Sequence, residues 1–212
     1  MAPVLRLYED VLGNDGGELS LPPLPHVIYV VQGSIAIAGR TVERDEGFGG
    51  EAAAGIKGGP EGATIWRWEL VAEGAPAALA GASVTSREKL AARLDTLPKG
   101  PVLLRGDSVA FPPGGCAYLH RHQGPGIRCL LAGGIRIDSA GRSTSYGPGT
   151  PWFESGPEPV FAQATDQPTR FARVMVLPMA YLARSSVEYL REEDKDKPRT
   201  QTYKIYADMP IV

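Results

Sequence analysis

The chain contains an internal repeat, which limits its fold more than any other feature. The segment HVIYVVQGSIAI, which begins at His26, aligns with GIRCLLAGGIRI, which begins at Gly126. Gly33 falls on Gly133, and apolar residues occupy most of the remaining positions. Each copy continues through a Gly- and Pro-rich turn region into a second apolar run, TIWRWELV in the first copy and TRFARVMVLP in the second. The repeat predicts two similar units in tandem.

Both copies have the pattern of β-structure. The 212 residues include 26 Gly and 19 Pro, a content that suits many short strands joined by tight turns. Hydrophobic residues make up 43% and charged residues 22%, which is ordinary for a globular protein and unlike a disordered one. We therefore expect an all-β fold.

A short helix is predicted between the copies, over residues 85–100. Thr85 and Glu88 have the spacing of a capping box, in which two side chains satisfy free backbone N–H groups at a helix start. Leucines at helical spacing and a stop signal follow, at Leu90, Leu94, Leu97, Pro98 and Gly100. The helix would link the two β units.

The predicted organisation has four parts, namely a first unit at 1–84, the linking helix at 85–100, a second unit at 101–180 and a C-terminal tail at 181–212. The charge run in this tail is typical of a solvated segment. Its last part, TYKIYADMPIV, could add an edge strand to its own unit or to a partner's.

Charge and hydrophobicity exclude several classes of partner. The formal net charge is -2 and the basic residues are scattered, so nucleic acid is not an expected partner. No stretch approaches the roughly 20 apolar residues of a membrane span, and the N-terminal region lacks a signal-peptide pattern. We expect a cytoplasmic protein without membrane contact, in which Cys116 and Cys129 stay free thiols.

Two of the three histidines stand as a pair in the strand-like segment CAYLHRH. Residues two apart share a face of a strand, so Cys116, Tyr118, His120 and His122 are expected to point the same way. Two neutral imidazoles can bind a divalent Fe, Mn, Ni or Zn ion, although two ligands alone rarely hold one against water. The pair therefore predicts a metal site that needs a third ligand.

The spacing around this pair resembles the first motif of the cupin superfamily. That motif is a Gly, five residues, His, one residue, His, three or four residues, Glu, six residues and Gly. Here the positions are Gly114, His120, His122, Gly126 and Gly133, so every spacing fits but Gly126 replaces the Glu. The second motif is only loosely matched by GPGTPWFESGPEPVFAQA, and its His has no counterpart because no histidine follows His122.

The resemblance implies a bicupin, with double-stranded β-helix (jelly-roll) barrels in tandem and any active site inside a barrel. In the first copy Ser20 and Pro22 stand where the paired histidines would be, and His26 stands at the Glu position. The first barrel is then a degenerate copy that supports the second. His26 is expected to be a core or interface histidine and not a ligand.

Five further residues complete the predicted site. Glu154, close to the start of the loosely matched second motif, is the favoured third ligand, and Gln163 is the alternative ligand or a substrate-binding residue. Arg128 could hold a substrate carboxylate or instead form a salt bridge with Glu154. Tyr118 could act as a general acid or simply pack, and Trp152 could form a pocket wall.

Two functions follow from these residues. The first is a metal-dependent enzyme, such as a dioxygenase, isomerase, lyase or cyclase, that acts on a small polar or carboxylate-bearing molecule. The alternative is a metal-free binding or regulatory module, because two of the family's ligands are missing. Either protein is expected to take a small-molecule ligand and to form a homodimer.

Overall fold

The computed structural model describes residues 2–211 and separates into two compact units, one that runs to Asp95 and one that begins at Thr96. Within the described residues the only helical segments are the 3-10 turn η1 (Met179–Tyr181) and the four-residue α1 (Glu192–Lys195). No helix in this part of the chain has the length and hydropathy needed to span a membrane. The all-β prediction is confirmed.

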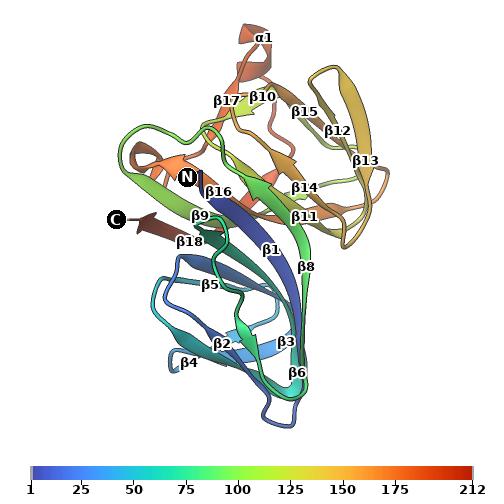
Figure 1. The fold of residues 1–212 in the computed structure, drawn as a ribbon. Helices are drawn as coiled ribbons and strands as arrows, with labels where there is room; N and C mark the ends of the chain where they lie inside the picture. The colour runs from blue at the N-terminus through green and yellow to red at the C-terminus, as the bar shows by residue number, and fades with distance from the viewer. Residues whose placement is uncertain (1, 212) are drawn as a thin grey trace. The chain divides into compact units, whose positions relative to one another are not determined.

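The first unit is one eight-stranded sheet with the order β4-β3-β6-β1-β8 and three short strands beside this path. Figure 1 shows β1 between β6 and β8. The strands are β1 (Val4–Leu12), β2 (Glu18–Leu21), β3 (His26–Ile37), β4 (Arg40–Glu43), β5 (Gly47–Gly50), β6 (Ala54–Val71), β7 (Leu79–Ala80) and β8 (Val84–Arg93).

The inner face of this sheet is apolar in one part and charged in another. Alternation along β6 puts Ile65, Arg67 and Glu69 on one face. Ile65 belongs to the apolar core, with Leu12, Leu19, Leu21, Ile28, Val30, Ile35, Ile37, Val42, Ile56 and Ala63. The charged residues form what we call the charged cluster, which consists of Arg6, Asp10, Arg67 and Glu69.

The predicted linking helix at 85–100 is wrong, because most of this segment is the strand β8. β8 pairs along β1, with Tyr8 opposite Glu88 and Asp10 opposite Ser86. Tyr8 Oη donates to Glu88 Oε2 at 3.1 Å, and Ser86 Oγ donates to the Asp10 carboxylate. Glu88, one of the two residues that imitate a helix start, therefore has a cross-strand partner, and pairing with the free edge of β1 outweighs local helix propensity.

His26 lies at the start of β3 and is fully buried. Its Nδ1 is 2.9 Å from the Leu24 carbonyl oxygen, which can only accept, so Nδ1 carries the proton. Nε2 has no hydrogen-bond partner among the described residues, and the ring stacks on Phe48. Burial lowers the pKa of His26, against the opposing effect of Glu69. His26 is thus a core residue that remains neutral.

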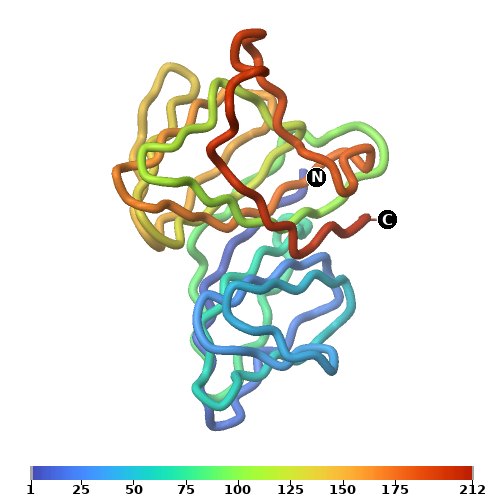
Figure 2. Tube along the Cα trace, turned by 180° about the vertical axis from the view of Figure 1, so that it is seen from behind, coloured from blue at the N-terminus to red at the C-terminus, as the bar shows by residue number. Residues whose placement is uncertain are grey.

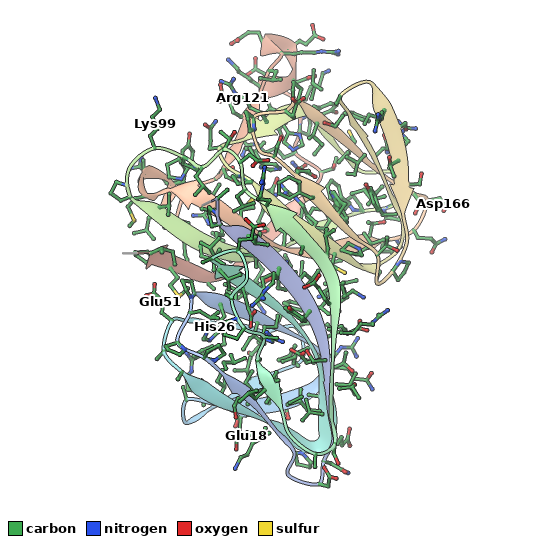
Figure 3. All side chains as sticks on the ribbon, in the orientation of Figure 1. Glu18, His26, Glu51, Lys99, Arg121 and Asp166 are labelled. Carbon is green, nitrogen blue, oxygen red and sulfur yellow. The ribbon has the colours of Figure 1, made fainter. Side chains whose placement is uncertain are left out.

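Replacing His26 with leucine is expected to reduce the loss of stability in acid. Because the folded pKa lies below the unfolded one, the unfolded chain takes up a proton first, so the wild type loses stability as the pH falls below about 6.5. Between the two pKa values this loss is about 1.4 kcal/mol per pH unit, and His26→Leu removes it. Glu69, Arg67 and Glu51 also act on this imidazole, and Figure 3 labels Glu51 together with His26.

Urea unfolding at neutral pH and at about pH 5 measures this difference. A Trp152→Phe background leaves Trp66 and Trp68 of the first unit as the only indole fluorophores. Equal pH dependence of the two proteins would mean that folding does not lower the pKa of His26.

The second unit contains two five-stranded sheets, with the orders β13-β12-β15-β10-β17 and β14-β11-β16-β9-β18. Its apolar core includes Val109, Phe111, Ala117, Leu130, Ile135, Trp152, Val160 and Phe171. The strands are β9 (Val102–Phe111), β10 (Cys116–His122), β11 (Gly126–Ala132), β12 (Ile135–Ser139), β13 (Arg142–Tyr146), β14 (Pro151–Glu154), β15 (Val160–Ala164), β16 (Thr169–Pro178), β17 (Val187–Tyr189) and β18 (Thr202–Ile211).

The segment expected to be a C-terminal tail belongs to both sheets of this unit. β17 pairs with β10 at the edge of one sheet, and β18 pairs with β9 at the edge of the other. Figure 2 shows the return of this segment in red. Of the two alternatives for TYKIYADMPIV, the structure shows an edge strand on its own unit.

Candidate functional site

His120 and His122 lie on β10 and point into the second unit, where each is 4% exposed. Arg121 between them points outward to Glu188 (Figure 3). The pairing of β10 with β15 is irregular between Ala117 and His120. This bulge interrupts the simple alternation, so Ala117 shares the interior with the histidines.

Tyr118 therefore does not share the interior with the histidines, and the prediction that it does is wrong. It is half-buried and lies outside the cavity that the histidines line. The Lys197 ammonium lies 4.7 Å from the centre of its ring. A general acid on Tyr118 would not reach the imidazoles in this arrangement.

The two imidazoles face each other through their Nε2 atoms, which are 3.3 Å apart. His120 Nδ1 donates to the Tyr118 carbonyl oxygen at 2.7 Å, so in the neutral ring Nε2 carries the lone pair. Nη1 of Arg173, which can only donate, lies 3.4 Å from His122 Nε2 and favours a lone pair there too. Two acceptors thus point at the same place, and an electrophile between them would satisfy both.

A proton does not bind between the two imidazoles at neutral pH. Burial lowers the pKa of His120, and it lowers the pKa of His122 much further, with Arg173 and Arg128 acting in the same direction. His122 Nδ1 is buried and has no hydrogen-bond partner among the described residues. Both rings are therefore neutral at pH 7, the state in which imidazole binds a metal ion.

Glu154 reaches the same place from β14. It lies directly across from Gly126 in the pairing of β14 with β11, so its side chain occupies the face that a residue 126 side chain would use. Glu154 Oε2 is 3.6 Å from His122 Nε2, and Trp152 Nε1 donates to Oε1 at 2.8 Å. A carboxylate thus stands beside the histidines although the motif position itself holds glycine.

Gly126 could not carry that carboxylate. A Cβ added to it would lie 2.4 Å from the Val174 carbonyl oxygen and 2.7 Å from Met175 Cγ. The close approach of β16 therefore requires glycine at this position.

Gln163, the alternative third ligand, lies outside the cavity. It is opposite Cys116 in the pairing of β15 with β10, on the outward face. Its Nε2 donates to the Gly114 carbonyl oxygen at 2.8 Å. Gln163 therefore closes a turn and does not approach the imidazoles.

Two buried arginines accompany the histidines. Arg128 Nη2 lies 2.8 Å from Glu154 Oε2, so the predicted alternative of a salt bridge is present. Arg173 Nε lies 2.6 Å from Asp107 Oδ1. Burial lowers the pKa of Arg128 to about 10, whereas for Arg173 the Asp107 carboxylate outweighs burial and raises the pKa. Both guanidinium groups stay charged at neutral pH.

Sequence reasoning missed Arg173 and Asp107. The available signal was a charge inside an apolar strand, Arg173 in FARVMV and Asp107 in LLRGDSV. Charges in such positions are seldom buried unless they are paired.

The histidines, Arg128, Glu154 and Arg173 line a cavity of about 20 Å³, which we call the inner cavity. This space holds about one water molecule. Trp152 forms part of its wall and also lines an adjoining outer pocket of about 290 Å³, so it occupies the position predicted for a pocket wall.

The inner cavity contains two of the donor groups that a metal site would need. Among residues 2–211 no group of three or more His, Cys, Asp and Glu side chains is arranged to hold a metal ion. Two nitrogens that bind one ion at about 2.1 Å with angles of 90–110° lie roughly 3.0–3.4 Å apart, which the histidine pair matches. The pair fits a metal ion, and Glu154 lies within reach but is paired with Arg128.

Solved structures share this fold. A point mutant of Bacillus subtilis oxalate decarboxylase OxdC aligns with a TM-score of 0.66 and 13% identity, over 91% of this chain and 73% of that chain. Another aligned structure comes from work on the Mn(II) centres of the same enzyme. AerE from Microcystis aeruginosa aligns with a TM-score of 0.59 and 13% identity, over 84% of this chain and 89% of that chain. A cupin 2 conserved barrel domain protein from Leptotrichia buccalis gives 0.50 and 12%, over 82% and 84%.

No protein-family model and no curated protein matches the sequence. At 12–13% identity the structural likeness shows the fold and not the activity.

Proposed function

Because this chain has a cupin fold, we propose that its second unit binds a divalent transition metal ion, such as Fe, Mn, Ni or Zn, through His120 and His122. The observation that carries this proposal is the pair of Nε2 atoms, 3.3 Å apart, with His120 Nδ1 2.7 Å from the Tyr118 carbonyl oxygen and Arg173 Nη1 3.4 Å from His122 Nε2. Glu154, 3.6 Å from His122, is the third ligand of the proposal. A bound ion would supply a Lewis acid or an oxygen-binding centre.

Glu154 must change partners to complete the site. In the structure its Oε2 is paired with Arg128, without the alignment of a hydrogen bond. If the Glu154 carboxylate moved toward the histidines, it would exchange the Arg128 guanidinium for the bound metal ion. Arg128 would then be free to bind an anion.

The protein residues define the substrate class. Arg128, once released by Glu154, offers Nη2, because its Nη1 donates to the Gly126 carbonyl oxygen. Arg173 Nη1 points at the histidines while Nε and Nη2 are held by Asp107. A carboxylate matches such donors. We propose an enzyme that acts on a small carboxylate-bearing molecule, with Arg128 and Arg173 as substrate anchors.

The first unit is, in this proposal, a degenerate copy of the same barrel, so that the chain is a bicupin. The pairing of β3 with β6 corresponds to that of β11 with β16. Arg67 lies opposite Ile28 in the first pair of strands, and Arg173 lies opposite Arg128 in the second. His26 has the position in β3 that Gly126 has in β11. This unit has no histidine pair. Its proposed role is to support the second unit.

Metal content tests the proposed site. Wild-type protein purified without chelator is expected to carry about one transition-metal ion per chain, and His120→Ala and His122→Ala are expected to lower this content at least about tenfold, because removing one of three ligands destroys the site. Elemental analysis after gel filtration measures it. The matched control is His26→Ala, which also removes a buried imidazole but lies in the other unit and should keep its metal.

Metal in His120→Ala at the wild-type level, or no metal in any of the proteins, would refute the site. The second outcome favours a metal-free module that binds small anions, a candidate that the two buried guanidinium groups support. In that case a chelator such as EDTA would leave anion binding intact.

A further inference from the structure

We propose that Tyr203 is the gate of the inner cavity and sets the size of the anion that can enter. This inference rests on the proposed function for the identity of the ligand, a small carboxylate. It concerns a residue outside the repeat, on the strand β18.

Tyr203 is a cavity-lining residue that also faces solvent. It lies opposite Val109 in the pairing of β18 with β9, and both residues line the inner cavity. Tyr203 is nevertheless 40% exposed, whereas His120 and His122 are each 4% exposed. Tyr203 is thus the most exposed of the residues that line the inner cavity.

The side chain is held by two contacts. Gln201 Nε2 donates to its hydroxyl at 3.0 Å, and the Arg173 guanidinium lies 5.7 Å from the centre of its ring. β18 is the outermost strand of its sheet in the described part of the chain. A rotation of Tyr203 therefore meets no neighbouring strand on that side.

The closed cavity is too small for a carboxylate. At about 20 Å³ it accommodates roughly one water molecule, so a larger ligand requires a wall to move. Trp152, on another wall, is 4% exposed and packs edge to face on Phe171, so it is held on more sides than Tyr203. Tyr203 is therefore less constrained than Trp152.

Charge also favours entry past Tyr203. Behind its ring lies Arg173, whose Nη1 points to His122. The outer pocket instead presents two carboxylates, Glu154 and Glu158, against one guanidinium, that of Arg142. An anion is therefore attracted on the side of Tyr203 and less so on the side of the outer pocket.

Chemical modification of the histidines in metal-free protein tests the gate. Tyr203→Ala is expected to raise the rate at which diethyl pyrocarbonate modifies His122 by about tenfold or more, because reaction requires access to a buried imidazole. Tyr203→Phe, which keeps the ring but loses the contact with Gln201, should raise it about two- to threefold. Peptide mass spectrometry assigns the modification to each histidine.

The control variant is Ile205→Ala, which shortens another exposed side chain of β18 that does not line the cavity. It should leave the rate at His122 within about twofold of wild type. Equal rates in Tyr203→Ala and Ile205→Ala would overturn the gate, and so would an equal rise at His26, which would indicate general loosening.

Calorimetry with formate and benzoate measures the size limit. Wild type is expected to bind formate at least about tenfold more tightly than benzoate, and Tyr203→Ala is expected to reduce this preference to within about twofold. An unchanged preference would overturn the proposal. The modification readout needs no bound metal, so loss of the metal site and failure of the gate are distinguishable.

Discussion

Replacing Gly126 with glutamate is expected to destabilise the second unit by about 3 kcal/mol or more, although it would restore the residue of the cupin motif. The Cβ alone would lie 2.4 Å from the Val174 carbonyl oxygen, and that oxygen belongs to the backbone of β16. β11 and β16 would have to separate at the centre of their sheet. The histidine site would then be lost and not completed.

Thermal unfolding followed by circular dichroism, together with metal analysis, measures this effect. The matched control is Gly147→Glu, because a Cβ at Gly147 meets no atom within 4 Å and its backbone has no positive φ. It should change the unfolding free energy by about 0.5 kcal/mol or less. A stable Gly126→Glu protein with more metal than wild type would show that β16 can yield and that a motif carboxylate fits.

Replacing Arg67 with methionine is expected to cost about 3–5 kcal/mol, the second large effect. Arg67 is fully buried in the first unit, with its Nε 2.7 Å from Asp10 Oδ2 and its Nη1 paired with Glu69. Glu69 keeps a partner in Arg6, at 2.7 Å, but Asp10 would lose its only ion pair within residues 2–211. The cost arises from leaving a buried carboxylate without a cation.

Urea unfolding of the first unit, followed by Trp66 and Trp68 in the Trp152→Phe background, measures this loss. Arg93→Met is the control, since its ion pair with Asp95 is exposed and worth at most about 1 kcal/mol. Adding Asp10→Asn to Arg67→Met should recover about 1–2 kcal/mol, because the unpaired charge is removed. A cost below about 1 kcal/mol for Arg67→Met would mean that water enters the charged cluster.

The strand content was predictable because it depends on patterns that each copy contains within itself. The apolar run that begins at His26 became β3, and the run that begins at Gly126 became β11 and β12. β3 pairs with β6 in the way that β11 pairs with β16. The helix at 85–100 failed for the opposite reason. Its capping residues Thr85 and Glu88 are local signals, whereas the edge of β1 that pairs with them lies about eighty residues away in sequence.

The candidate site was predictable in part. His120, His122 and Glu154 lie together because strand alternation and cross-strand pairing place them there. Alternation failed for Tyr118, since a bulge cannot be recognised in CAYLHRH without its partner strand. Tyr203 was missed because its place in the wall depends on the pairing of β18 with β9, a contact between distant parts of the chain.

That same pairing has a consequence for synthesis on the ribosome. β9 begins the second unit at Val102, yet its partner β18 ends at Ile211, so one side of β9 waits for almost the whole unit to be made. During translation at roughly 5–20 residues per second, this edge is exposed for several seconds as an unpaired strand. The last strand of the first unit, β8, ends at Arg93, so all strands of that unit are made before β9 leaves the ribosome. The order of synthesis thus makes the second unit the more vulnerable to aggregation and to chaperone capture.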